Sequence, residues 1–241
     1  KYPILLLHGA LGAKSQLNML KGYFEKLGHN VTIFEFSGHG ETPVKNDFSI
    51  AAFASELIQF VTDAKQQNNF LVFGYSMGGY VALHAALQVP QLFKGMITLA
   101  TKFNWTPENA QHEVRMLNPI KIEEKIPAFA QVLDKRHKTL NWKENMLLTA
   151  NMMIELGNQP VIKIESLKNL NLPVLYAVGD RDEMITMEET SGAYKNTPHS
   201  AMAVLPMTSH PIEKINSELL PFLLQSWEQC AIKYPTSQTN D

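Results

Sequence analysis

The sequence predicts a mostly parallel α/β sheet that is flanked by helices and carries a helical insertion between two of its strands. Two observations support this fold class. Short apolar, β-branched runs alternate with longer segments of helical periodicity, which is the pattern of strand–helix–strand units. The interval 104–168 contains no strand-like run, yet it is far too long for a loop.

Six segments are expected to form strands, because most of them are apolar at every position, as in a sheet covered on both faces. In chain order they are residues 3–7, 31–36, 70–75, 95–100, 173–178 and 201–205. Helical periodicity predicts helices near residues 15–28, 50–67, 77–88, 184–195 and 212–226. The core is therefore expected to comprise residues 1–103 and 169–233, and the polar residues 234–241 are expected to fray.

The interval 104–168 is expected to be a helical lid. Thr106 before Pro107 pairs a capping hydroxyl with a first-turn proline, and a further helix over 141–154 is expected to end before Gly157. Large apolar side chains of a lid make an adaptable pocket wall. The substrate-binding candidates are Trp105, Met116, Trp142, Met146 and Met153. The alternative is that such side chains form the core of the lid itself. Basic residues that could instead bind a substrate carboxylate are Lys102, Arg115, Lys135, Arg136 and Lys138. The alternative, which we favour for most of them, is that they are solvated surface charges.

Composition and charge exclude several classes of protein. The 241 residues carry 21 Lys and Arg against 23 Asp and Glu, so no basic surplus indicates a nucleic-acid or anionic-membrane partner. The single cysteine, Cys230, excludes an internal disulfide framework and cysteine-rich zinc sites. No apolar run approaches the length of a spanning helix and no signal segment is recognisable. We expect a cytoplasmic protein with a small-molecule substrate; its oligomeric state is not indicated.

The segment Gly74-Tyr75-Ser76-Met77-Gly78-Gly79 lies between an expected strand and an expected helix. A tight turn there would hold the Ser76 hydroxyl out of the sheet, and the flanking glycines would leave room around it. The helix N-terminus would direct backbone N–H groups at a reacting carbonyl. The sequence therefore predicts that Ser76 is a nucleophile; the alternative is a glycine-rich turn needed only for packing.

A nucleophilic serine needs a base and a residue that orients the base. Of the eight histidines, His210 follows an expected strand and precedes an expected helix, which places it at the carboxyl edge of the sheet. Asp180 and Asp182 follow the preceding strand at the same edge. We favour Asp182 as the acid because it lies deeper in the loop, and Asp180 as a brace of the turn. The backbone N–H groups of Ala10 and Met77 are the expected oxyanion donors, with His8 shaping the loop of Ala10.

These segments together resemble the α/β-hydrolase superfamily, and within it the small lid-bearing esterases, lactonases and carbon–carbon bond hydrolases. The resemblance rests on His8-Gly9-Ala10-Leu11-Gly12, Gly38-His39-Gly40, the Ser76 segment, Gly179-Asp180-Arg181-Asp182 and His210. It implies the same triad and oxyanion donors, no metal and no organic cofactor. Members usually have an antiparallel strand pair before the His-Gly strand, at which this sequence starts, and many have glycine where Ser209 precedes His210. Ser76 excludes the relatives with aspartate at this turn.

The predicted function is that of a serine hydrolase that cleaves an ester-like bond of a small, largely apolar substrate through an acyl-enzyme. Two alternatives remain open. A carbon–carbon bond hydrolase or a lactonase would use the same triad, and a ligand receptor would keep the fold without turnover.

Overall fold

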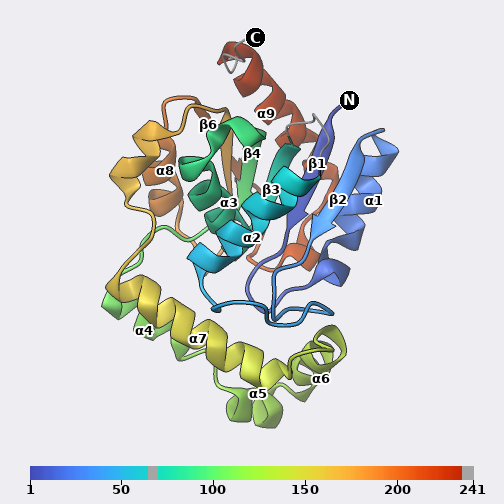
Figure 1. The fold of residues 1–241 in the computed structure, drawn as a ribbon, viewed down its shortest axis with the longest axis vertical. Helices are drawn as coiled ribbons and strands as arrows, with labels where there is room; N and C mark the ends of the chain where they lie inside the picture. The colour runs from blue at the N-terminus through green and yellow to red at the C-terminus, as the bar shows by residue number, and fades with distance from the viewer. Residues whose placement is uncertain (65–69, 235–241) are drawn as a thin grey trace.

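A computed structural model describes residues 1–64 and 70–234, so the tail predicted at 234–241 lies, beyond Tyr234, outside the described residues. Six strands form one sheet in the order β2-β1-β3-β4-β5-β6, and every neighbouring pair is parallel (Figure 1). The strands are β1 (Pro3–Leu7), β2 (Asn30–Phe34), β3 (Phe70–Tyr75), β4 (Phe93–Leu99), β5 (Val174–Gly179) and β6 (Ser200–Leu205). The predicted fold class is confirmed, and each strand overlaps its predicted segment.

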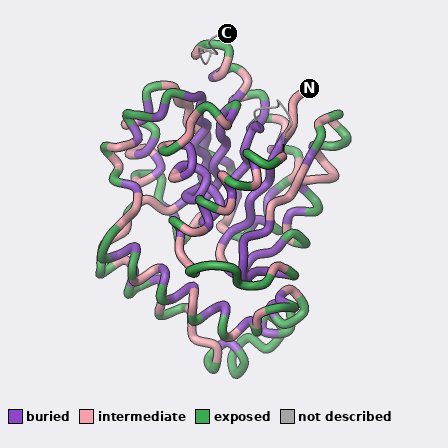
Figure 2. The backbone as a smooth tube through the Cα atoms, in the orientation of Figure 1, coloured by how far each residue is buried: buried purple, intermediate pink, exposed green. Residues whose placement is uncertain are grey.

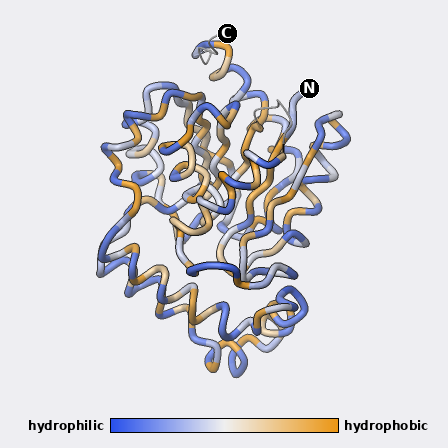
Figure 3. Tube along the Cα trace, in the orientation of Figure 1, coloured by the Kyte–Doolittle hydropathy of each residue, from blue (hydrophilic) through white to orange (hydrophobic). Residues whose placement is uncertain are grey.

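Strands β1, β3 and β5 are apolar throughout, as expected where both faces of the sheet are covered (Figures 2 and 3). Leu5 and Val72 are register partners that pack on one face, whereas Leu6 and Phe73 are partners on the other. All four side chains are buried. Burial of each such side chain stabilises the fold by about 1.5–3 kcal/mol.

Helices α2 (Ile50–Asp63), α3 (Met77–Gln88) and α8 (Met187–Asn196) contribute to the hydrophobic cluster on one face of the sheet. Helices α1 (Asn18–Lys26) and α9 (Leu220–Lys233) contribute to the cluster on the other. The sheet is therefore the middle of three layers. Because its strands are parallel, their carboxyl ends all lie at the same edge of the sheet.

Four helices and a short 3-10 helix lie between β4 and β5 in the chain. They are α4 (Pro107–Val114), α5 (Pro119–Lys125), α6 (Pro127–Arg136), α7 (Trp142–Asn158) and η3 (Ile164–Asn169). Helices α4 to α7 lie at the end of the molecule opposite both termini (Figure 1). The Thr106 hydroxyl caps α4, as the sequence predicts, by accepting a hydrogen bond from the Asn109 N–H at 3.2 Å. The boundaries 104–168 stay a prediction.

Two predicted helices have wrong boundaries. Helix α7 does not end before Gly157 but continues to Asn158, and Gly157 lets α4 approach closely: a Cβ there would lie 2.5 Å from the Cβ of Ala110. The helix predicted over 212–226 begins at Leu220 and ends at Lys233, with 3-10 turns at Ile212–Lys214 and Ser217–Leu219 before it. Pro221 lies in the first turn of α9, where its missing N–H costs nothing.

Candidate active site

The turn between β3 and α3 holds Ser76 in a strained conformation. Its φ of 51° and ψ of −117° are sparsely populated for a residue with a side chain. Two hydrogen bonds fix this conformation. The Ser76 N–H donates to the carbonyl of Leu99 at 2.8 Å, and the Ser76 carbonyl accepts from the Thr101 hydroxyl at 3.1 Å. The turn needs glycine at position 79, where a Cβ would lie 2.1 Å from the Thr101 oxygen. The surrounding structure therefore fixes the conformation of Ser76, a half-buried residue that lines a pocket.

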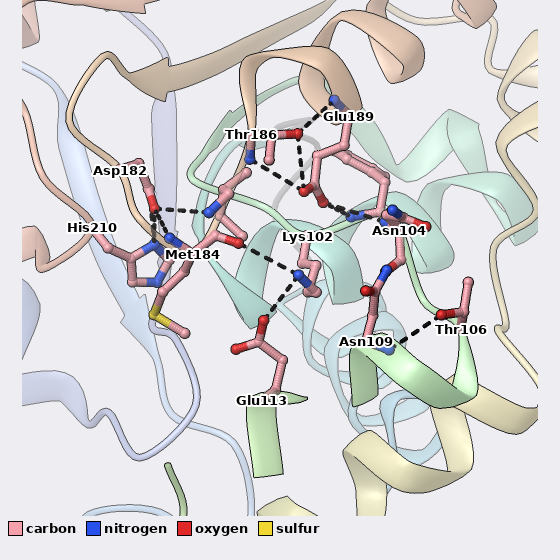
Figure 4. A network of polar contacts seen from close by, with 12 residues as sticks. Lys102, Asn104, Thr106, Asn109, Glu113, Asp182, Met184, Thr186, Glu189 and His210 are labelled. Carbon is pink, nitrogen blue, oxygen red and sulfur yellow. Dashed lines mark hydrogen bonds and ion pairs between the residues drawn. The ribbon is translucent and has the colours of Figure 1, made fainter. Parts of the chain in front are cut away.

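His210 and Asp182 come from neighbouring loops after β6 and β5 and meet at the carboxyl edge of the sheet. The Nδ1 atom of His210 lies 2.9 Å from Oδ2 and 3.2 Å from Oδ1 of Asp182 (Figure 4). Oδ1 also accepts hydrogen bonds from the N–H groups of Met184 and Ile185, each at 2.9 Å. Only 1% of the Asp182 side chain is exposed, so these donors replace water around an ionised carboxylate. A proton on Nδ1 leaves Nε2 of His210 free to accept another.

The loop of His210 is braced by groups other than Asp182. The hydroxyl of Tyr75 donates to the carbonyl of His210 at 3.0 Å, and burial raises the pKa of Tyr75, which keeps this donor protonated. The Oδ1 atom of Asp180 accepts from the N–H of Thr208 at 3.3 Å. Asp180 thus contacts the loop backbone while Asp182 contacts the imidazole, as the sequence predicts for the two aspartates.

The loop after β1 brings the N–H of Ala10 to the same pocket as Met77. Within residues 1–64 and 70–234, neither N–H has a hydrogen-bond acceptor in the protein. The next residue, Leu11, has a φ of 56° and is held through its carbonyl, which accepts from Nη1 of Arg136 at 2.9 Å and contacts Nε2 of His137 at 3.2 Å. Helix α6 therefore helps to fix the loop after β1, although the contacting residues are 125 or more positions apart in the sequence.

Three buried histidines, His8, His39 and His137, lie near this loop, and their ring nitrogens form hydrogen bonds with backbone groups. The Phe36 N–H donates to Nε2 of His8, so Nδ1 carries the proton and donates to the Gly9 carbonyl at 2.8 Å. The Gly40 N–H donates to Nδ1 of His137, which makes Nε2 the donor to Leu11. Burial lowers the pKa of His8 to about 4, and it lowers the pKa of His39 and of His137 as well. All three are neutral scaffold groups near pH 7.

Ser76, His210, Ala10 and Met77 line one pocket beneath α4 and α7, and its volume is about 40 Å³. Of the predicted substrate-binding residues, Trp105 and Met153 line it, together with apolar side chains that the sequence analysis did not select: Ile50, Tyr80, Met152, Leu156, Met184 and Ile185. A pocket for a drug-sized ligand has a volume of about 300–1,000 Å³. An acyl group therefore enters only if the flexible methionine side chains move.

Three predicted substrate-binding residues lie elsewhere. Met116 is 71% exposed and projects from the turn after α4. Trp142 and Met146 are buried against Leu133 in a hydrophobic cluster within the insertion itself. Their apolar faces stabilise the packing of α6 on α7, and none of the three lines the pocket.

The sequence analysis missed Glu113, whose carboxylate lines the pocket beside Lys102. Helical spacing from the buried Ala110 places Glu113 on the inner face of α4 and could have indicated it. Sequence reasoning gave His137 no role, and it considered Arg136 as a carboxylate ligand or a solvated surface charge. Their contacts with Leu11 join residues 125 or more positions apart, which no local pattern shows.

Comparison with known proteins identifies the family. A sequence model of the protein family described as the alpha/beta hydrolase fold matches residues 2–120, which include the loop of Ala10 and the turn of Ser76. The chain belongs to the α/β-hydrolase superfamily. The chain is 27% identical over 128 residues to the sn-1-specific diacylglycerol lipase ABHD11 of Xenopus laevis, a match that covers 52% of this chain and 41% of that protein.

A second curated relative, ethanol acetyltransferase 1 of Hanseniaspora uvarum, is 34% identical over 104 residues. The match covers 40% of this chain and 29% of that enzyme. The matches therefore span about two fifths or less of each relative. Solved structures show the same fold along nearly the whole chain. A thermophilic esterase of Thermogutta terrifontis superposes with a TM-score of 0.74 at 20% identity, covering 95% of this chain and 90% of that chain.

No helix in the described ranges is both long enough and apolar enough to cross a bilayer. The same ranges contain no cluster of three or more His, Cys, Asp or Glu side chains suited to a metal ion.

Proposed function

We propose that the chain is a serine hydrolase that cleaves an ester-like bond of a small, largely apolar substrate through an acyl-enzyme. One observation carries this proposal: Ser76 on its strained turn and His210 line one pocket, and the imidazole of His210 lies 2.9 Å from the buried carboxylate of Asp182. Curated relatives named as a lipase and an acetyltransferase, both acyl-transfer enzymes, support the same chemistry.

In the first half-reaction, Nε2 of His210 takes the proton of the Ser76 hydroxyl as Oγ attacks the substrate carbonyl. The N–H groups of Ala10 and Met77 stabilise the oxyanion, and each such donor contributes about 2.7–4 kcal/mol to catalysis in known acyl transfers. Asp182 holds the imidazole in the tautomer that accepts at Nε2 and stabilises the imidazolium. The leaving alcohol then takes the proton from His210, and an ester of Ser76 remains.

In the second half-reaction, His210 removes a proton from water, and the hydroxide attacks the acyl-enzyme. The tetrahedral species collapses, Ser76 recovers its proton from His210, and the carboxylic acid leaves. The apolar lining of the pocket suits a hydrocarbon acyl group, whose transfer from water favours binding at roughly 25 cal/mol per Å² of buried surface.

The test is a time course of p-nitrophenyl ester hydrolysis over acyl lengths from two to twelve carbons, with the wild type beside Ser76→Ala. We expect turnover with a chain-length optimum in the wild type and none above background in Ser76→Ala, which should melt at the same temperature. If both proteins are folded and equally active, Ser76 is not the nucleophile. If neither turns over any ester, the carbon–carbon substrates and the receptor alternative take precedence.

Acyl transfer to an alcohol is a second candidate, favoured by the 34% identity to ethanol acetyltransferase 1 over 104 residues. The acyl-enzyme would be the same, and an alcohol would replace water in the second half-reaction. Ethyl ester formation in the presence of ethanol, measured by gas chromatography, distinguishes the two. A product that is only carboxylic acid excludes the transferase.

A further inference from the structure

An ion pair lies in the wall of this apolar pocket. Nζ of Lys102, three residues beyond the end of β4, lies 3.0 Å from Oε1 of Glu113 on α4, and both residues line the pocket with Ser76 and His210. Their side chains are only 14% and 10% exposed. Figure 4 shows the pair beside the His210–Asp182 contact, with the Lys102 ammonium also directed at the carbonyl of Met184, 3.4 Å away.

Other carboxylates of this protein are satisfied by structural donors. Glu35 accepts from the N–H groups of Lys14 and Glu41 and from the Thr42 hydroxyl, at 2.8–3.0 Å. In contrast, the carboxylate of Glu113 has no hydrogen-bond partner besides Lys102 in the ranges 1–64 and 70–234. One carboxylate oxygen of Glu113 and one N–H of the Lys102 ammonium are therefore left for a group in the pocket.

Stability does not explain such a pair. Moving two charges out of water has a large desolvation cost. One ion-pair contact, a long hydrogen bond from Lys102 to the Met184 carbonyl and the Trp105 ring 5.9 Å from Nζ offset this cost only in part, and apolar residues of similar volume are commonly as good or better. By comparison, another Lys–Glu pair, Lys143 and Glu123 of the insertion, is solvent-exposed and avoids most of this cost. The pair in the pocket therefore requires an explanation at the level of ligand binding.

The position of Lys102 is fixed by the chain on both sides. The hydroxyl of Thr101, its neighbour, bonds the carbonyl of Ser76 at 3.1 Å. After Lys102, the N–H of Phe103 donates to Oε1 of Glu189 on α8 at 2.8 Å. Glu189 also completes a capping box with Thr186, so the strand-to-insertion connection is tied to a helix end (Figure 4). The backbone at Lys102 is thus held at a set place relative to the turn of Ser76, and Glu113 and the Met184 carbonyl hold the ammonium.

We propose that Lys102 and Glu113 form a specificity site for a neutral group of the substrate that both accepts and donates a hydrogen bond, such as a hydroxyl. The hydroxyl oxygen accepts from the Lys102 ammonium, and its hydrogen is donated to the free oxygen of Glu113. This inference rests on the proposed hydrolase function and names its substrate class: esters whose acyl chain carries a hydroxyl group, rather than unsubstituted alkanoates.

The charges of the pair exclude the two other kinds of substituent. A substrate carboxylate near Lys102 would also lie next to the Glu113 carboxylate, and the two negative charges would repel each other in an environment of low polarity. A hydrocarbon chain would desolvate both ions without returning a hydrogen bond. A neutral hydroxyl leaves the net charge of the pocket unchanged and satisfies both partners.

The test uses four methyl esters with six-carbon acyl chains, followed by proton release: hexanoate, 3-hydroxyhexanoate, 6-hydroxyhexanoate and the monoester of adipate. The first is apolar, two carry a hydroxyl at different distances from the reacting carbonyl, and the last is anionic. We expect kcat/KM for at least one hydroxy ester to exceed that for hexanoate by tenfold or more in the wild type.

The double variant Lys102→Met/Glu113→Leu removes both charges together, so neither is left unpaired, and it retains similar volume. It should bring the ratio of hydroxy ester to hexanoate within twofold of one. The matched control, Lys143→Met/Glu123→Leu, changes the same charges on the exposed pair and should keep the wild-type ratio. Thermal melting of both variants checks that they are folded.

Equal rates for hexanoate and both hydroxy esters in an active wild type overturn the inference and leave the hydrolase function standing. A preference for the adipate monoester also overturns it, in favour of an anionic substrate bound by Lys102. A hydroxy preference that persists in the folded double variant shows that other groups are responsible. Absence of any Ser76-dependent turnover refutes the hydrolase function, and the inference falls with it.

Discussion

Replacing Arg136 with methionine should slow catalysis although Arg136 does not line the pocket. The guanidinium of Arg136 joins three parts of the molecule. From α6, its Nη1 donates to the carbonyl of Leu11 at 2.9 Å, and its Nη2 lies 3.1 Å from Oε1 of Glu213, three residues after His210. The loop after β1, which carries the proposed oxyanion donor Ala10 and is called the oxyanion loop below, thus shares one brace with the loop of the candidate base.

The free energy that Arg136 contributes to stability follows from the environment of each of its contacts. A hydrogen bond from a charged donor contributes about 1.5–3 kcal/mol. The ion pair with Glu213 adds roughly 0–1 kcal/mol, since that side chain is 47% exposed. His137 still contacts the Leu11 carbonyl, so the acceptor keeps one partner and no large desolvation penalty is added. We therefore expect Arg136→Met to lower the free energy of unfolding by about 2 kcal/mol.

The Arg136 contact restrains Leu11, whose positive φ has an energetic cost, and it thereby fixes the adjacent N–H of Ala10. If the loss of about 2 kcal/mol is fully expressed in the transition state, it corresponds to a decrease of about 30-fold in kcat. We expect a 10- to 30-fold lower kcat for p-nitrophenyl butyrate and a KM within twofold of the wild type. Urea unfolding of the same protein gives the loss in stability.

The control is Lys135→Met, which removes the same charge from an exposed position one residue away on α6. It should leave kcat and the unfolding free energy close to the wild-type values. A folded Arg136→Met protein with kcat within twofold of this control would refute the reasoning that links α6 to the oxyanion loop.

Three further outcomes are expected. Asp182→Asn should lower kcat by about 10⁴-fold in steady-state assays, because an amide no longer fixes the imidazole tautomer. Gly79→Ala should reduce the unfolding free energy by about 1–3 kcal/mol in urea titrations, because its Cβ would lie 2.1 Å from the Thr101 hydroxyl oxygen. The unfolding free energy should also fall as pH decreases from 6.5 towards 4. Burial lowers the pKa of His8 to about 4 in the folded state, so only the unfolded chain binds that proton in this range.

Each of these has its own check. Asp180→Asn keeps the imidazole contact and should retain far more activity than Asp182→Asn; equal losses would contradict the assignment. Gly192→Ala, at a helical glycine with open space around it, should be neutral or stabilising. For the pH dependence, His8 alone accounts for about 3 kcal/mol over the full window. A constant unfolding free energy between pH 7.5 and 5, above most carboxylate titration, would show that His8 is not buried uncharged.

Local patterns predicted the fold well because the deciding interactions are local. The six strands are short apolar runs, and the turn at Ser76 lies between a strand and a helix whose residues are adjacent in sequence. The order of the sheet then brings the loops of Asp182 and His210 to one edge, which the chain order alone indicates. These are the features that a single sequence can show.

The rest depends on contacts between distant segments. Hydrophobicity could not separate Met153, which lines the pocket, from Trp142, which packs on α6, because both are apolar residues of one helix. It could not show that Glu113 faces Lys102, since that depends on how α4 lies over the sheet. The late start of α9 reflects Pro221, whose ring fixes the first turn.

The insertion's separate hydrophobic cluster has a consequence for how this gene can change. That cluster consists of Leu11, Ile122, Ala130, Leu133, Trp142 and Met146, and the only one of these that lies outside the insertion is Leu11. Substitutions among the others can accumulate with little effect on the sheet, whereas a change at Leu11 alters two structures at once. Descendants of this sequence should therefore vary freely on the outside of α5 and α6, and should show paired substitutions wherever the insertion meets the oxyanion loop.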